Sequence, residues 1–212
     1  MTYEWTARKS FIEIFKMFSL DLRRLVFKYR SYTPLPFLIL MLIFAKPTSA
    51  SLISGFAVVL IGEAIRLWGV SIAGSETRTT GKVGGTYLIT NGAFAYVRNP
   101  LYVGNMVMYL GVGIMSLALF PWLLIVAAAF FYIQYAMIVS QEEEYLAATF
   151  AEQYKHYAAH VGRFFPRLSP YQSLTPHAKQ LNWQEGFASE RRTIQAIGLV
   201  TLLIVMLHVV QK

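Results

Sequence analysis

Residues 101–139 read LYVGNMVMYLGVGIMSLALFPWLLIVAAAFFYIQYAMIV and contain no acidic or basic side chain. A helix needs about 20 mostly apolar residues to cross the hydrocarbon core of a membrane. The stretch is long enough for two such helices, and the Phe120-Pro121 pair divides it into segments 101–119 and 122–139. These residues therefore predict two consecutive spanning helices and an integral membrane protein.

The composition of the whole chain indicates the same class. Of its 212 residues, 56% are hydrophobic and 14% are charged, whereas soluble domains carry about a quarter charged residues. Apolar segments at 50–73 and 194–210 predict two further spans, and the shorter segment 35–45 predicts a fifth if its flanks reach the interfaces. We expect an all-α, polytopic bundle of about five transmembrane helices.

The charge of the chain is typical of a membrane protein. The formal net charge of +8 could suit a nucleic acid, but so apolar a chain has little soluble surface on which to present it, so we expect a membrane partner and no nucleic acid. There is no cysteine, which excludes disulfides, thiolate metal sites and cysteine nucleophiles. No cleavable signal peptide is expected either, because the basic N-terminus leads into an amphipathic stretch.

The first 33 residues differ from the rest. From Phe11 to Tyr29, apolar residues recur at helical spacing with lysines and arginines between them. The pattern predicts an amphipathic helix that either lies in the membrane interface or packs on the protein's own loops. We expect two units, an interfacial helix at 1–33 and a transmembrane domain at 34–212.

Basic residues also predict the orientation of the bundle. Lysines and arginines are concentrated in 1–33, 74–100 and 141–193, and basic loops stay on the cytoplasmic side. We therefore expect the N-terminus and these loops to be cytoplasmic.

Polar residues gather in two of these loops. The first, GTYLITNGAFAYVRNPLYVG at 85–104, runs directly into a predicted span. Asn99 is suited to cap that helix and Pro100 to be its first residue. Arg98 and the helix-terminal amides would then offer a place for a carboxylate or phosphate. A well-capped helix with an interfacial Arg98 and Tyr102 would show the same residues without a ligand.

The second segment, EEEYLAATFAEQYKHY at 142–157, follows the fourth span. Three acids at the cytoplasmic end of a helix oppose both the helix dipole and the anionic membrane surface. Glu142 and Glu143 therefore predict nearby hydroxyls, an ammonium group or a cation. Glu144 fits equally well in the first turn of a helix that restarts there.

Two smaller patterns of charged residues lie outside these motifs or overlap them. Glu152, His156 and His160 share one helix face, but incidental histidines on a surface helix are commoner than a metal site, and we expect no metal. Glu63 and Arg66 stand three residues apart in the second predicted span, which predicts an ion pair on one helix face.

The two segments together carry a family resemblance. Gly92, Phe94, Arg98-Asn-Pro, Tyr102 and Gly104, followed by Glu142-Glu143, Phe150, Tyr154, Tyr157 and Pro166, resemble the isoprenylcysteine carboxyl methyltransferase family and the related phospholipid methyltransferases. The resemblance covers residues 79–166. It implies a membrane-embedded methyltransferase that binds S-adenosylmethionine at cytoplasmic segments 79–104 and 141–166 and not on a Rossmann sheet.

The resemblance also implies roles for individual residues. The cofactor would be bound by Tyr87, Leu88, Ile89, Phe94, Arg98, Asn99, Pro100, Leu101, Tyr102, Glu142 and Glu143. Arg98 and Tyr102 would act at the reacting centre. A sulfonium suits aromatic faces, while the cofactor's carboxylate suits Arg98 and its hydroxyls or ammonium suit Glu142. The acceptor would be a lipid-like or prenylated molecule that enters from the bilayer.

Three positions depart from the family pattern. Asn99 stands where many members have histidine, and Ala151 stands where glycine is usual. Ile138 replaces a substrate-binding arginine of the isoprenylcysteine enzymes, and we expect it to face the same pocket as Glu142. An acceptor other than isoprenylcysteine is therefore expected.

Two other functions remain open on the sequence. Membrane reductases that use NADPH on sterols or other isoprenoids end with a similar Arg-x-Pro-x-Tyr-x-Gly block. A non-enzymatic membrane scaffold is the other alternative.

Overall fold

The computed structural model describes residues 23, 25–74, 87–173 and 180–212, and within them the chain is all-helical. The elements are α2 (Pro34–Ile43), α3 (Ser49–Ala73), the 3-10 helix η2 (Gly92–Ala95), α4 (Pro100–Ser116), α5 (Trp122–His160) and α6 (Trp183–Val210). The prediction of an all-α membrane bundle is confirmed. Most of the predicted amphipathic helix at 1–33 lies outside the described residues, although residues 25–29 are helical.

Each predicted span corresponds to one helix, but the lengths differ. Among the described helices, α3, α5 and α6 are long and apolar enough to cross a membrane, whereas α4 and α2 are shorter apolar helices of 17 and 10 residues. At about 1.5 Å per residue, α4 is about 25 Å long and α2 about 15 Å. The hydrocarbon core is about 30 Å thick, so α2 covers only about half of it.

The helix α6 begins well before the apolar segment that predicted it. Its first residue is Trp183, and the Asn182 side chain accepts a hydrogen bond from the Glu185 backbone amide at 3.2 Å. This is an ordinary N-cap, which satisfies one of the free amides of the first turn. Hydropathy detects only the apolar part of such a helix, because the first turns are polar.

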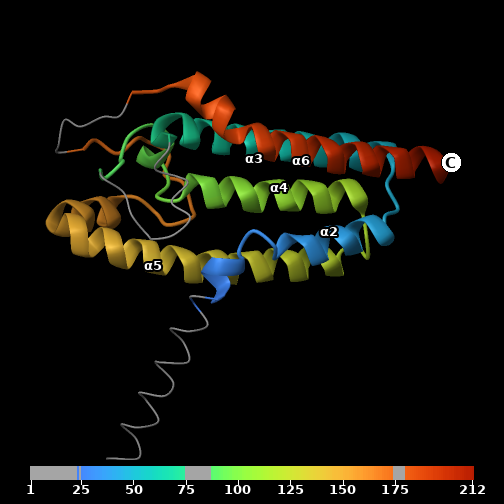
Figure 1. The fold of residues 1–212 in the computed structure, drawn as a ribbon, viewed down its shortest axis with the longest axis horizontal. Helices are drawn as coiled ribbons and strands as arrows, with labels where there is room; N and C mark the ends of the chain where they lie inside the picture. Colours follow the sequence, from blue (N-terminus) through green and yellow to red (C-terminus); the bar gives the residue numbers. More distant parts are fainter. Residues whose placement is uncertain (1–22, 24, 75–86, 174–179) are drawn as a thin grey trace, which may run out of the picture.

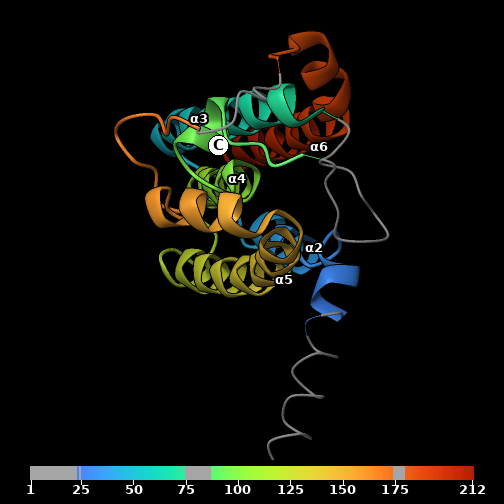
Figure 2. The same cartoon turned by 90° about the vertical axis from the view of Figure 1, so that its left-hand side faces the viewer.

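The helices form three tiers, with α4 in the middle. Figures 1 and 2 show α3 and α6 on one side of α4, and α5 and α2 on the other. Glycines let α3 and α4 approach closely: a Cβ added to Gly62 would lie 2.7 Å from the Gly104 carbonyl oxygen, and one added to Gly111 would lie 2.8 Å from the Gly55 oxygen. Seven residues separate the two glycines on each helix, so both contacts fall on one face.

The long helix α5 reverses near its end. Ala151 has φ +42° and ψ −113°, a non-helical conformation in the middle of the element. Figures 1 and 2 show the last part of α5 turned back toward α4. Glycine adopts positive φ without steric cost, which gives a physical reason for the glycine that the family usually has at this position.

The chain that follows α5 is held against the segment before α4. The backbone amide of Arg98 donates to the Gly162 carbonyl at 2.9 Å, and those of Arg167 and Tyr171 donate to the carbonyls of Tyr96 and Ala95 at 2.9 Å each. The two polar segments of the sequence are therefore joined directly at one end of the bundle.

Candidate functional site

A cavity of about 850 Å³ lies among α2, α3, α4, α5, α6 and the segment before α4. This size is typical of small-molecule sites, which enclose about 300–1,000 Å³. Of the eleven predicted cofactor-binding residues, ten line it: Tyr87, Leu88, Ile89, Phe94, Arg98, Asn99, Leu101, Tyr102, Glu142 and Glu143. Pro100 is fully buried at the start of α4. The structure thus brings together residues that lie up to 56 positions apart in the sequence.

Glu142 is bound to the first turn of α4. The Tyr102 hydroxyl donates to Glu142 Oε1 at 2.7 Å, and the Tyr102 ring lies 4.8 Å from that of Tyr135, centroid to centroid. Tyr135 also lines the cavity, as do Tyr154 and Tyr157 from the reversed part of α5. The carboxylate of Glu142 therefore lies against the Tyr102 hydroxyl in a cavity lined by aromatic side chains. It has acceptor capacity left beyond the Tyr102 bond.

Arg98 and Glu143 form the centre of a second network. The Arg98 Nε and Nη2 atoms lie 3.1 and 3.0 Å from Glu143 Oε1, and Nη1 donates to the Ala158 carbonyl at 2.7 Å. The other Glu143 oxygen accepts a hydrogen bond from the Arg163 guanidinium. This hydrogen bond raises the pKa of Arg163. Arg98 lines the cavity, yet most of its donors are used by the protein. It stabilises the segment that returns after Ala151.

Glu144 behaves differently from its two neighbours. It points outward and pairs with Arg23 at 3.2 Å, with 67% of its side chain exposed. An exposed pair of this kind contributes about 0–1 kcal/mol. The three consecutive acids therefore share no partner, and of the three only Glu142 and Glu143 line the cavity.

The predicted capping hydrogen bond from the Asn99 side chain to the start of α4 is absent. Pro100 is the first residue of α4 as expected, but the Asn99 side chain forms no capping bond. Its Nδ2 instead donates to the Arg163 carbonyl at 3.1 Å. The reason is that the segment returning after α5 packs against the helix start and offers an acceptor there.

The predicted position of Ile138 is also wrong. Ile138 is fully buried in the hydrophobic core with Phe131 and Tyr135, and it does not line the cavity. Ile138 lies one turn nearer the middle of α5 than Glu142 and packs there with the apolar side chains of the core. The difference from the isoprenylcysteine enzymes at this position does not alter the cavity wall.

The predicted Glu63–Arg66 ion pair is replaced by a pair that the sequence did not reveal. Arg66 Nη2 lies 2.8 Å from Glu190 Oε1 on α6, and Arg66 Nη1 donates to Asn105 Oδ1 on α4 at 2.7 Å. The Glu63 oxygens are buried and have no hydrogen-bond partner among the described residues. Arg66, Asn105 and Glu190 line the cavity. Glu190 lies one helical turn before the apolar run of α6, and this position next to a predicted span could have indicated a partner for Arg66.

The histidines of α5 have local partners. His156 Nδ1 lies 2.8 Å from the Tyr171 hydroxyl, and His160 Nδ1 lies 2.7 Å from the His156 carbonyl oxygen. Within the part of the chain that the structure describes, no three His, Asp or Glu side chains gather as metal ligands.

Known proteins are similar to the part of the chain that holds most of the cavity-lining residues. Residues 50–153 match the family model described as phospholipid methyltransferase. The cobalt-zinc-cadmium resistance protein CzcN of Cupriavidus metallidurans is 35% identical over 107 residues, which are 50% of this chain and 44% of that protein. The nickel-cobalt-cadmium resistance protein NccN of Alcaligenes xylosoxydans xylosoxydans is 32% identical over 127 residues, 59% of this chain and 54% of that protein. The chain spans about half the length of these curated relatives.

Proposed function

Through residues 50–153 this chain belongs to the phospholipid methyltransferase family, and on that premise we propose that it is an S-adenosylmethionine-dependent methyltransferase. Three helices among the described residues are long and apolar enough to span a membrane, which supports an integral membrane protein. The proposed acceptor is a lipid-like or prenylated molecule at the cytoplasmic interface. Segments 79–104 and 141–166 of the transmembrane domain would bind the cofactor.

The observation that carries the proposal is the convergence of two distant segments on one cavity. Tyr87, Phe94 and Tyr102 come from one segment and Glu142 and Glu143 from the other, and all five line the same space. A scaffold would need no such mixed polar and aromatic cavity. The volume of about 850 Å³ leaves room for a nucleoside-sized cofactor and part of a second molecule.

The chemistry of the lining fits the cofactor. Aromatic faces attract a sulfonium, and the rings of Phe94, Tyr102, Tyr135 and Tyr157 line the cavity. Glu142 can accept hydrogen bonds from ribose hydroxyls or an ammonium group. The cofactor, when bound, supplies a methyl group that is already activated on sulfur.

The residues of the chain would then position the reactants and exclude water, which is the main requirement of such a transfer. The hydrogen bond between Tyr102 and Glu142 fixes both side chains at the start of α4. Arg98 and Glu143 hold the returning segment over that site. A carboxylate acceptor needs no base, whereas a protonated amine acceptor must lose a proton before it accepts the methyl group, and the Glu142 carboxylate would be the candidate base.

The test is equilibrium binding of S-adenosylmethionine and, separately, NADPH to the purified protein in detergent. We expect S-adenosylmethionine to bind. Glu142→Gln and Arg98→Ala should each raise its dissociation constant about ten- to hundredfold, because a hydrogen bond to a charged group contributes about 1.5–3 kcal/mol. Lys155→Gln is the control, since that side chain is exposed and pairs only with Glu152 among the described residues.

Each alternative function has its own outcome in this test. Binding of NADPH without S-adenosylmethionine would favour the reductase, and binding of neither would favour the scaffold. Unchanged binding of S-adenosylmethionine by folded Glu142→Gln and Arg98→Ala proteins would show that the cofactor lies elsewhere. If S-adenosylmethionine binds, transfer of label from methyl-labelled S-adenosylmethionine to a total lipid extract would identify the acceptor class.

A further inference from the structure

The cavity contains two arginines that are not used by the networks described above. Four arginines and three glutamates line it. Arg66 pairs with Glu190 and Arg98 with Glu143. Arg30 and Arg192 form no ion pair with any residue that the structure describes. Two positive charges of the lining are therefore in direct contact with no acid among the described residues.

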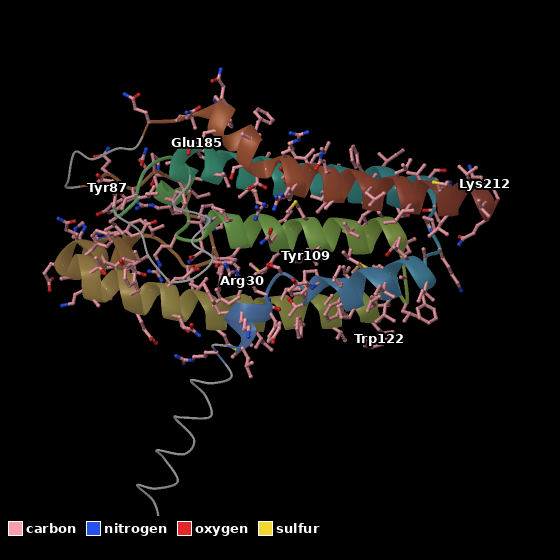
Figure 3. All side chains as sticks on the ribbon, in the orientation of Figure 1. Arg30, Tyr87, Tyr109, Trp122, Glu185 and Lys212 are labelled. Carbon is pink, nitrogen blue, oxygen red and sulfur yellow. The ribbon has the colours of Figure 1, made fainter. Side chains whose placement is uncertain are left out.

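Arg30 is held at the cavity without losing most of its donors. Its Nη1 atom donates to the Phe27 carbonyl at 2.9 Å, and its guanidinium lies 4.0 Å from the centre of the Phe27 ring. These contacts keep the side chain in place and leave other N–H groups for a ligand. Its charge also acts on Tyr102 and Glu142, so Arg30 lies near the proposed reacting centre. Figure 3 shows it between Tyr87, at one end of the molecule, and Trp122, toward the other.

The two arginines occupy equivalent places on different helices. Arg30 stands four residues before α2 begins, and Arg192 stands on α6 two residues before the apolar run 194–210. Each therefore marks the point where a helix becomes apolar, which is the depth of lipid head groups.

Beyond the arginines, the cavity lining becomes apolar. Leu35 and Leu38 of α2 and Ile197 and Val200 of α6 continue it. Residues three apart lie on one helix face, so each helix presents an apolar strip to the same space. Leu35 is 49% exposed, which brings this part of the lining to the outer surface of the bundle. The arrangement matches an amphiphile that has its charged end at the arginines.

We propose that Arg30 and Arg192 bind the anionic head group of the lipid acceptor, whose tail lies between α2 and α6. The inference rests on the proposed function and deepens it, because it assigns the head group of the acceptor to two named residues of the cavity lining. The shared chemistry is a phosphate or carboxylate. Guanidinium groups bind both through paired, charge-assisted hydrogen bonds.

The test compares ligands that differ only in head charge. Binding of dioctanoyl phosphatidic acid and dioctanoylglycerol, and of dodecanoate and dodecanol, is measured with the full chain in an uncharged detergent. Inorganic phosphate is the probe without a tail. We expect the parent to prefer the anion in at least one pair, and Arg30→Gln and Arg192→Gln each to weaken that binding about ten- to hundredfold. Arg191→Gln is the matched control, because both neighbouring arginines are exposed on α6 but only Arg192 lines the cavity.

Three results would overturn the inference. The first is that the parent shows no preference for the anion in either pair. The second is that both cavity variants retain the preference. The third is that inorganic phosphate binds as tightly as the lipid anion, which would leave no role for the tail.

Binding of S-adenosylmethionine is measured on the same variants. It should fall less than binding of the lipid anion in Arg30→Gln and Arg192→Gln. A larger loss of S-adenosylmethionine binding than of anion binding would mean that these arginines hold the cofactor's carboxylate, which also overturns the inference. If the parent binds the lipid anion through the arginines but does not bind S-adenosylmethionine, the head-group site stands and the methyltransferase proposal fails.

Discussion

The buried pair between Arg66 and Glu190 should be the strongest single link between α6 and the rest of the bundle. Glu190 has only 3% of its side chain exposed, and both of its oxygens lie within 3.2 Å of Arg66 nitrogens. In Glu190→Gln, Arg66 keeps its charge and its bond to Asn105 but loses its carboxylate. Removing one partner of a buried ion pair costs about 3–5 kcal/mol, because the other charge stays buried.

The expected change in melting temperature follows from chain length. For proteins of about 150–250 residues, about 1 kcal/mol shifts the melting temperature by about 2–4 °C. Glu190→Gln should therefore melt roughly 6–20 °C below the parent. Arg66→Met with Glu190→Met should recover much of the loss, because an apolar pair can replace a buried ion pair at little cost.

The assay is thermal unfolding of the purified variants in one detergent, with Glu152→Gln as the control. Glu152 is 84% exposed in its pair with Lys155, so Glu152→Gln should change the free energy of unfolding by no more than about 1 kcal/mol. Glu63 also interacts electrostatically with Arg66 and could replace Glu190, so Glu63→Gln with Glu190→Gln should be less stable than Glu190→Gln alone. A melting temperature for Glu190→Gln within about 2 °C of the parent would refute the reasoning.

Three further outcomes are expected. Ala151→Gly should raise the unfolding free energy by roughly 1 kcal/mol, because positive φ costs an L-residue about 1–2 kcal/mol, and an unchanged melting temperature would contradict it. Gly62→Val should lower the free energy of unfolding by about 1–3 kcal/mol, because the added side chain overpacks against Gly104. Gly198 has open space around it, so Gly198→Ala should melt at the same temperature as the parent. A cysteine at Ser173 should react with an impermeant reagent only after the membrane is opened, and labelling in intact cells would reverse the predicted orientation.

The helical bundle could be predicted from the sequence because the bilayer imposes a simple requirement. A spanning helix must be apolar over about 20 residues, and such runs are visible one by one. The same reasoning could not determine how far each helix extends. Polar turns such as 183–193 of α6 and the second half of α5 carry no hydropathy signal, and their helical state depends on caps and on tertiary partners.

Much of the candidate site was also predictable, but not its pairings. The two segments were identified because their acids, aromatic residues and arginine are unusual at a membrane boundary. The partner of each charge is set by tertiary structure: Arg66 could reach Glu63 three residues away or Glu190 on another helix, and it pairs with Glu190. For the same reason the sequence shows that Ile138 lies one turn before Glu142, but it does not show that Ile138 faces the core and not the cavity.

The reversal at Ala151 explains why the site needs both segments. If α5 continued straight, residues 152–163 would extend away from the start of α4. Arg98 would then lose its bonds to Ala158 and Gly162, and Glu143 would lose Arg163. The strained backbone at one residue thus places Tyr154 and Tyr157 in the cavity lining. An unfavourable local conformation is stabilised here by the contacts that it makes possible, which is how strain persists at sites that bind ligands.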